Sequence, residues 1–411
     1  MPAAEFFNVK TVEAALDALF EQWCPQPRIV RCTTQQALGR VTVRPSQSPI
    51  NLPEFVRSSM DGYAVRAVDT FGASASLPAY LKLTTSVRMG VTPDFDLKAG
   101  EAAEISTGAS IPRGADAVVM VERTQKFSDT EIEVLAPVAP GENLVQVGED
   151  VQAGGIILPV GQCIRPQDIG GLLAVGVLEV EVAAPPRVAL IGSGDELVAP
   201  GDVPQPGQIR DINSYTLAAL AQSCGAEVVH GGIAADKFEA LDAVARQALD
   251  QADILVVSAG SSVSARDLTS TVIENLGAPG ILQHGLAVKP GKPTIIALCD
   301  GTPVIGLPGN PVSALLVARQ ILVPIIRRAL GETPRLVGTV RATLTANVAS
   351  ATGREDTIPV RLSGTAGQLQ AEPIFGKSNL IYTLVNADGV ILVPLNSGGL
   401  KAGSDVEVVT F

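Results

Sequence analysis

The feature that most constrains the fold is an alternation of apolar runs and amphipathic segments between residues 187 and 330. Apolar runs at 188–191, 227–231 and 254–257 each read as a buried strand that ends in a loop rich in Gly, Ser or Asp. Helical patterns follow at 214–224, 237–251, from about Leu268, and at 312–330. Such alternation predicts a doubly wound parallel sheet with helices on both faces.

The segments on either side of this α/β region predict β structure. Residues 77–134 are rich in Val, Thr, Gly and Ala with short alternations, and residues 335–411 alternate between strand patterns and Gly or Pro turns. A short helix is expected near 167–176, and Pro185–Pro186 marks a stiff boundary before the α/β region. We therefore expect an α/β multi-domain protein with a β-rich insert and a C-terminal all-β domain.

Composition excludes several function classes. A chain of 411 residues is too long for a single core. Its net charge of −12 argues against a nucleic-acid surface. Two histidines make a His-rich metal site improbable, and five scattered cysteines fit a reducing compartment. No signal-peptide pattern and no membrane-length apolar stretch is visible, so a cytoplasmic protein is expected.

A turn that carries two lysines is the main candidate anion site. Lys289 and Lys292 flank Pro290 and Gly291. The whole chain has nine lysines, and two of the three between residues 183 and 330 lie in this turn. The nearby loop 306–311 opens a helix, so its backbone N–H groups can also face an anion.

Acidic residues recur just after the predicted strands, at Asp195, Glu196, Asp236 and Asp267. In a doubly wound sheet such positions converge on one crevice, where carboxylates and phosphate oxygens can hold Mg²⁺. No Ser–His–Asp or Cys–His arrangement and no phosphate-loop or dinucleotide-binding glycine signature is evident. The residues alone indicate a site for a phosphorylated small molecule and an anion with Mg²⁺.

Simpler readings of these segments stay open. Any doubly wound sheet has small-residue loops at its strand ends. Asp61–Gly62 is also a common hairpin turn, and Ser106–Gly108 could be an ordinary turn.

Five segments in this order resemble the molybdopterin molybdenumtransferase family, which includes the E domain of gephyrin. They are SSMDGYAVR at 58–66, STGASIPRGADAVVMVE at 106–122, GSGDELVAPG at 192–201, SAGSSVSARD at 258–267 with KPGKP at 289–293, and GLPGNPVSA at 306–314. Each segment is weak alone, whereas the ordered set is specific and, with the domain pattern, covers nearly the whole chain.

The resemblance implies four domains in an elongated homodimer. Residues 1–45 and 151–184 would form a discontinuous linker and dimer domain, 46–150 the β-rich insert, 185–330 a molybdopterin-binding α/β domain, and 331–411 the C-terminal β domain. The implied activity is insertion of molybdate into adenylylated molybdopterin with Mg²⁺-assisted release of AMP, which gives molybdenum cofactor. The molybdopterin adenylyltransferase is an implied partner.

The resemblance also implies roles for individual residues. The implied catalytic residues are Asp61, Asp267, Lys289 and Lys292. The implied metal ligands are Asp150, Asp195, Glu196, Asp236 and Asp267. The implied substrate-binding residues are Ser58, Thr107, Gly194, Asp195, Glu196, Asp236, Gly260, Ser261, Ser262, Ser264, Pro293, Gly309, Asn310, Arg354 and Ser378.

This sequence departs from the family pattern in two places. Where the common family loop reads SGGVSVG, this chain has Ala259, Ser261 and Ser264 in place of Gly, Val and Gly. Arg266 stands just before Asp267. Pro359 stands where an arginine is often found. These departures leave a tungstate-preferring transferase as an alternative hypothesis. Two further alternatives are a non-catalytic scaffold, as the family's link to receptor clustering allows, and the related molybdopterin adenylyltransferase, which shares the α/β domain.

Overall fold

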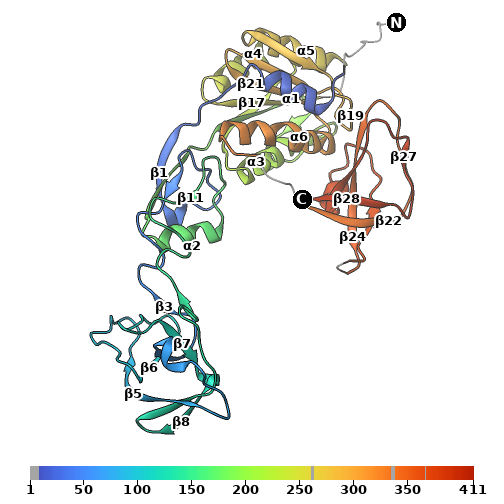
Figure 1. Cartoon of the computed structure of the whole chain (residues 1–411). Coiled ribbons are helices and arrows are strands. Elements are labelled where there is room, and N and C mark those ends of the chain that lie inside the picture. The colour runs from blue at the N-terminus through green and yellow to red at the C-terminus, as the bar shows by residue number, and fades with distance from the viewer. Residues whose placement is uncertain (1–8, 261–262, 335–337, 366) are drawn as a thin grey trace.

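The protein is an elongated molecule whose domains differ in architecture (Figure 1). The computed structural model describes residues 9–260, 263–334, 338–365 and 367–411. An α/β layer lies at one end, a β-rich insert at the other, and a narrow linker joins them. The C-terminal β domain packs beside the α/β layer (Figure 1). Among the described residues, no helix is long and apolar enough to cross a membrane.

The α/β layer is built on a six-stranded sheet. In spatial order its strands are β16 (Glu227–Ala234), β13 (Arg187–Ser193), β17 (Ile254–Ala259), β21 (Thr302–Pro308), β20 (Ile295–Cys299) and β18 (Pro279–His284). The first four run parallel to one another, whereas β20 and β18 pair in antiparallel fashion. The sheet is therefore mixed rather than wholly parallel, because a hairpin returns the chain from β20 into β21. A short ladder joins β14 (Leu197–Val198) to β15 (Ile209–Arg210).

Helices cover both faces of this sheet. They are α1 (Val12–Phe20), α3 (Asn213–Ser223), α4 (Phe238–Leu249), α5 (Val263–Asn275) and α6 (Pro311–Ala329). Because strand side chains alternate, Leu190 and Val256 pack with α1, α3 and α6, whereas Ile191 and Val257 pack with α4 and α5. The doubly wound prediction is confirmed by these two separate apolar cores.

Two helices differ from the sequence prediction. Helix α5 begins at Val263 rather than near Leu268, which places Asp267 inside the helix and not in a loop. Helix α1 packs on the α/β core through Ala15, Leu16 and Leu19, whereas the family resemblance places residues 1–45 with the linker. The amphipathic stripe of α1 predicted a buried face, but a stripe does not name the surface that covers it.

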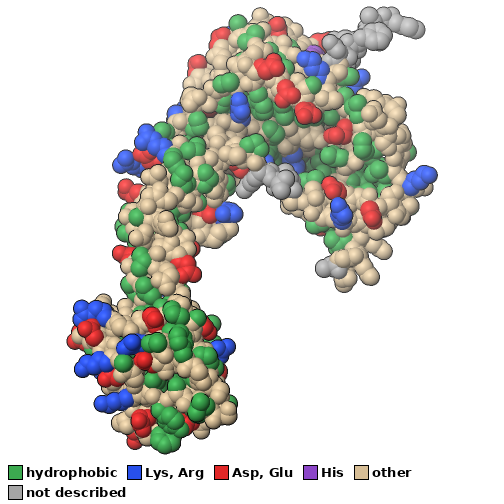
Figure 2. Space-filling model, in the orientation of Figure 1, with side chains coloured by type: hydrophobic (Ala, Val, Ile, Leu, Met, Phe, Trp, Pro, Cys, Tyr) green, Lys and Arg blue, Asp and Glu red, His purple; other side chains and the backbone are tan. Residues whose placement is uncertain are grey.

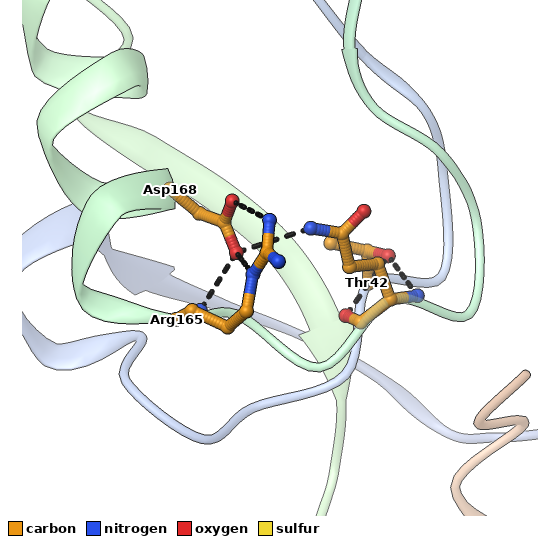
Figure 3. A network of polar contacts seen from close by, with 4 residues as sticks. Thr42, Arg165 and Asp168 are labelled. Carbon is orange, nitrogen blue, oxygen red and sulfur yellow. Dashed lines mark hydrogen bonds and ion pairs between the residues drawn. The ribbon is translucent and has the colours of Figure 1, made fainter. Parts of the chain in front are cut away.

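The linker is a small unit of two ladders and one helix. Strand β1 (Ile29–Thr33) pairs with β12 (Glu179–Ala183), β2 (Ser46–Gln47) pairs with β11 (Ile156–Leu158), and α2 (Pro166–Ala174) packs beside them. Figure 3 shows the polar network that starts α2. Asp168 accepts hydrogen bonds from the backbone N–H and the guanidinium of Arg165, and the side chain of Gln162 also donates to it.

The β-rich insert folds around its own six-stranded sheet. In spatial order its strands are β7 (Ala117–Met120), β4 (Gly62–Val65), β6 (Glu101–Ile105), β5 (Ala79–Val87), β9 (Glu131–Val134) and β8 (Thr124–Ser128). A two-residue ladder of β3 (Arg57–Ser58) and β10 (Leu144–Val145) joins the insert to the linker. Gly62 has no room for a side chain, because a Cβ there would lie 1.9 Å from the Val119 carbonyl oxygen.

The C-terminal domain is built on a third six-stranded sheet, which closes on itself. Its order is β19 (Val288–Lys289), β24 (Glu355–Ser363), β25 (Gln370–Pro373), β22 (Thr339–Leu344), β28 (Asp405–Thr410) and β26 (Gly389–Val393), and β26 also pairs with β24. Strand β23 (Val348–Ala349) pairs with β27 (Gly399–Leu400), and α7 (Tyr382–Val385) lies between β25 and β26 in sequence. Because β19 comes from the α/β segment, this ladder joins the two domains directly.

Candidate active site

A cleft of about 800 Å³ lies between the α/β layer and the C-terminal domain. Figure 2 shows this hollow, with basic side chains inside it. Four cationic side chains line the cleft, and among the described residues no carboxylate does. The four are Lys289, Lys292, Arg354 and Lys377. In a chain of net charge −12, this is a local reversal of sign that suits an anionic ligand.

The lysine turn reaches the cleft because its backbone is fixed on both sides. Lys289 lies in β19, and the Leu286 N–H donates to the Lys292 carbonyl at 2.8 Å. Gly291 between them has φ +107°, and a Cβ there would lie 2.0 Å from a Val317 methyl group on α6. Only glycine fits this close approach, so the turn is held against α6 with both ammonium-bearing side chains exposed to the cleft.

Several predicted substrate contacts line the same cleft. Pro293 follows the lysine turn, Asn310 is the N-cap residue just before α6, and Ser378 comes from the loop after β25. Gly309 packs against the end of β17, since a Cβ there would lie 2.7 Å from the Ala259 carbonyl oxygen. The structure therefore brings together residues from two domains that are up to about ninety positions apart in the sequence.

The acidic residues of the α/β layer gather at the ends of β13 and β16. The Asp236 N–H donates to Asp195 Oδ1 at 3.2 Å, and the Ser193 hydroxyl donates to Asp236 Oδ1 at 3.0 Å. Glu196 curls back over the turn, because a Cβ on Gly194 would lie 2.7 Å from its carboxylate. These loops lie at the same edge of the sheet as the lysine turn, several strands away.

The loop between β17 and α5 is only partly described. Gly260 is at the end of β17, where Ala265 is its near neighbour. Ser261 and Ser262 lie outside the described residues, and the side chain of Ser264 is not described either. Asp267 is exposed on α5, and its backbone carbonyl accepts hydrogen bonds from Ser270 and Thr271.

Other predicted site residues lie elsewhere in this chain. Asp61, Thr107 and Ser58 belong to the β-rich insert, at the far end of the molecule from the cleft (Figure 1). Asp61 accepts two hydrogen bonds from Thr107, which lower the pKa of its carboxyl below the ordinary value. Asp150 is exposed where the insert joins the linker, and its N–H donates to the Leu52 carbonyl.

The predicted five-acid metal set is not a single preformed cluster. Among the described residues, no group of three or more His, Cys, Asp or Glu is placed to hold a metal ion. Mg²⁺ needs fewer protein ligands, because it commonly takes one or two carboxylates together with substrate phosphates and water. The neighbouring carboxylates of Asp195 and Asp236 fit that requirement at one edge of the sheet.

Sequence patterns did not predict a role for three residues near the site. Lys377 lines the cleft and adjoins Ser378, so the scarcity of lysine in this chain could have revealed it. Asp356 is fully buried beside Lys289 and Arg354. Asn213 is buried and donates to the Ser258 hydroxyl and the Gly309 carbonyl, which ties the ends of β17 and β21 together. Nothing in the local sequence indicated the last two contacts.

Comparisons with known proteins bear on the whole chain. Family models match in chain order: MoeA N-terminal region (domain I and II) at residues 10–176, "Probable molybdopterin binding domain" at 189–328, and MoeA C-terminal region (domain IV) at 341–411. Molybdopterin molybdenumtransferase 2 of Mycobacterium tuberculosis is 34% identical over 379 residues, which is 91% of this chain and 93% of that protein. This chain belongs to the molybdopterin molybdenumtransferase family.

Further members of the molybdopterin molybdenumtransferase family agree. The molybdopterin molybdenumtransferase of Staphylococcus aureus is 30% identical over 406 residues, 98% of this chain and 96% of that protein. The crystal structure of the molybdopterin biosynthesis MoeA protein from Pyrococcus horikoshii OT3 superposes with a TM-score of 0.86 at 27% identity, covering 98% of this chain and 100% of that chain. The predicted family and fold class are confirmed.

Proposed function

We propose that this protein inserts molybdate into adenylylated molybdopterin and releases AMP, which gives molybdenum cofactor. Its family assigns it to molybdenum cofactor biosynthesis as a transferase. One observation carries the finer proposal: an acidic chain keeps four cations and, among its described residues, no carboxylate along one cleft. A four-oxygen dianion such as molybdate is the kind of ligand that lysine ammonium and arginine guanidinium groups bind together.

The layout of the sheet edge supports a long second substrate. Loops from β16, β13, β17, β21 and β20 follow one another along that edge, with the acids at one end and the lysine turn at the other. Four strand spacings of ~4.8 Å separate the two ends, which is about 19 Å. A dinucleotide-sized molecule can therefore reach the carboxylates with its phosphates while its reactive end meets the anion bound beside the lysines.

The chemistry divides between the two ends. Mg²⁺ held by Asp195 and Asp236 would neutralise phosphate oxygens and so assist cleavage of the phosphoanhydride. Lys289, Lys292 and Arg354 would bind and orient molybdate by charge-assisted hydrogen bonds. Gly309 and Asn310 present the start of α6, where backbone N–H groups favour an anion. The C-terminal domain supplies half of this cleft, which a single-domain adenylyltransferase would lack.

We also propose that the protein works as a homodimer in the cytoplasm. Asp61 and Thr107 are proposed site residues, yet the insert that carries them lies far from the cleft of the same chain (Figure 1). An elongated protein can complete such a site with the insert of a second copy. The cytoplasmic location rests on cysteine usage, since all five cysteines are free thiols.

The direct test is release of AMP from adenylylated molybdopterin by the purified protein, measured with and without molybdate and Mg²⁺. We expect release that depends on both. Lys292→Ala should lower molybdate-dependent turnover at least tenfold with little change in the melting temperature, because its exposed ammonium group lines the cleft. Lys401→Ala, which removes an exposed lysine of the C-terminal domain, is the matched control. Absence of AMP release at saturating substrate would refute the proposed activity.

A further inference from the structure

A fully buried carboxylate lies directly behind the cationic cleft. Asp356 is 0% exposed and accepts a hydrogen bond from Arg354 Nε at 2.9 Å through Oδ1. Its second oxygen, Oδ2, has no hydrogen-bond partner within the described part of the chain and lies 3.8 Å from Lys289 Nζ. A buried charge is costly unless it is paired, so this carboxylate depends on these two cations.

The backbone sets this arrangement. Strand β19 pairs in parallel with β24, and the register places Lys289 opposite Asp356 and Val288 opposite Glu355. The Glu355 N–H donates to the Ala287 carbonyl at 2.8 Å, which fixes the same junction from the neighbouring position. The α/β segment and the C-terminal domain thus each bring one cation to a shared carboxylate.

The two cations reach the cleft while the carboxylate does not. Lys289 and Arg354 both line the cleft, with 56% and 38% of their side chains exposed, whereas Asp356 is absent from its lining. The separation of 3.8 Å between Lys289 Nζ and Asp356 Oδ2 is longer than a hydrogen bond, so this contact is electrostatic. The Lys289 ammonium group is therefore attracted toward the Asp356 carboxylate by charge, without donating a hydrogen bond to it.

We propose that Asp356 is a positioning residue for the oxyanion site, which holds Lys289 and Arg354 at a fixed spacing across the domain junction so that both can bind one tetrahedral dianion. This inference rests on the proposed function and extends it by naming the group that sets the geometry of the anion site. Without such a counter-charge, two neighbouring cations would repel each other in the empty cleft.

Positioning and simple electrostatics predict opposite results for the loss of this charge. Asp356→Asn keeps the size of the side chain and removes one negative charge behind an anion site. If Asp356 acted only through its charge, molybdate would bind more tightly to the variant. If Asp356 positions the two cations, molybdate should bind more weakly despite the added positive potential.

The test combines molybdate titration by calorimetry with steady-state AMP release, on the full-length protein and on Asp356→Asn, Asp356→Glu and Glu407→Gln. Glu407 is exposed on β28, so its variant removes a negative charge from the same domain without touching the junction. We expect Asp356→Asn to raise the molybdate Kd and KM at least tenfold while the KM for adenylylated molybdopterin stays within twofold. Asp356→Glu should show a smaller rise, and Glu407→Gln should match the wild type.

The outcomes separate this inference from the proposed function. Unchanged or tighter molybdate binding by Asp356→Asn, or an equal rise in both KM values, would overturn the positioning role while wild-type AMP release still stands. Wild-type protein that binds molybdate without releasing AMP would refute the proposed reaction and leave the binding test of Asp356 intact; failure to bind molybdate at all would overturn both. If Asp356→Asn does not fold, Asp356→Glu decides the matter: molybdate affinity equal to wild type contradicts the inference.

Discussion

At the scale of single residues, Asp61 shows how a local contact prepares a carboxylate. Its Oδ1 accepts the Thr107 backbone N–H at 2.7 Å and the Thr107 hydroxyl at 3.0 Å. Both bonds favour the ionised form, so the pKa of Asp61 lies below the ordinary 3.8, with the backbone bond as the larger cause. The carboxylate is therefore fully charged at neutral pH and points two of its lone pairs at one residue.

Thr107→Val should raise the pKa of Asp61 without restoring it to the ordinary value. The substitution removes the hydroxyl donor but keeps the backbone N–H, which is the larger cause of the lowered pKa. Because the folded-state pKa is depressed, whatever stabilisation the contact gives is present above the unfolded pKa and is lost as pH falls through the folded one. A carboxyl ¹³C titration followed by NMR measures the change, and an unaltered pKa in the variant would contradict the assignment.

Residue types were predictable from the sequence, whereas their partners were not. Scarce lysines in a Pro–Gly turn identified Lys289 and Lys292, and motif resemblance identified Arg354 and Ser378, all of which line the cleft. Asp356 could not be found in this way, because its role depends on the register of β19 against β24 across a domain junction. No periodicity in either segment encodes that pairing.

At the scale of elements, the start of α2 depends on Asp168. This carboxylate is only 7% exposed and accepts bonds from Arg165 and Gln162, while it caps the first turn of the helix (Figure 3). The Arg165 side chain is the largest cause that lowers the pKa of Asp168, and burial opposes it. The network therefore favours the ionised carboxylate and joins the helix to the adjoining loop of the linker.

Asp168→Ala should destabilise the protein by about 1–2 kcal/mol at neutral pH, in the range for loss of a helix cap, since Arg165 is largely solvent-exposed and adds little. The sign of the pH dependence follows from the lowered pKa. The contribution is complete above the unfolded pKa near 3.8 and disappears as pH falls through the lower folded value. Urea unfolding of both proteins at pH 7 and near pH 3 measures this, and a difference that does not shrink on acidification would count against it.

Element types were predicted better than element directions and ends. Apolar residues at a spacing of about 3.6 residues predicted α3, α4 and α6 to within a few residues of their observed ends. Helix α5 begins five residues earlier than expected, because its Ser- and Ala-rich first turn has few apolar side chains to mark it. The antiparallel pairing of β18 and β20 also escaped prediction. A buried strand has the same apolar pattern in either direction, so its neighbours decide the direction.

At the scale of the whole molecule, the amino-acid sequence indicated the order of the domains along the chain but not the distance between them in space. The cleft lies between the α/β layer and the C-terminal domain, whereas Asp61 lies in the insert beyond the linker (Figure 1). Motif order along a chain says nothing about which copy of the chain supplies a residue. If Asp61 takes part in the reaction, the separation requires either a large bend in the linker or a second subunit.

Mixing two inactive variants distinguishes these possibilities. Asp61→Asn disables the insert and Lys292→Ala disables the cleft, so each homodimer should be inactive. In a mixed dimer whose sites combine the cleft of one copy with the insert of the other, one site has both Lys292 and Asp61. Random pairing of the two variants makes about half of the dimers mixed, and each mixed dimer has one intact site out of two. Co-expression should therefore restore about a quarter of wild-type AMP release. Sites completed within one chain would each keep one defect, and co-expression would then restore nothing. Co-expression of Lys292→Ala with Lys289→Ala is the matched control, because both defects lie in the cleft and no mixed dimer can contain an intact site.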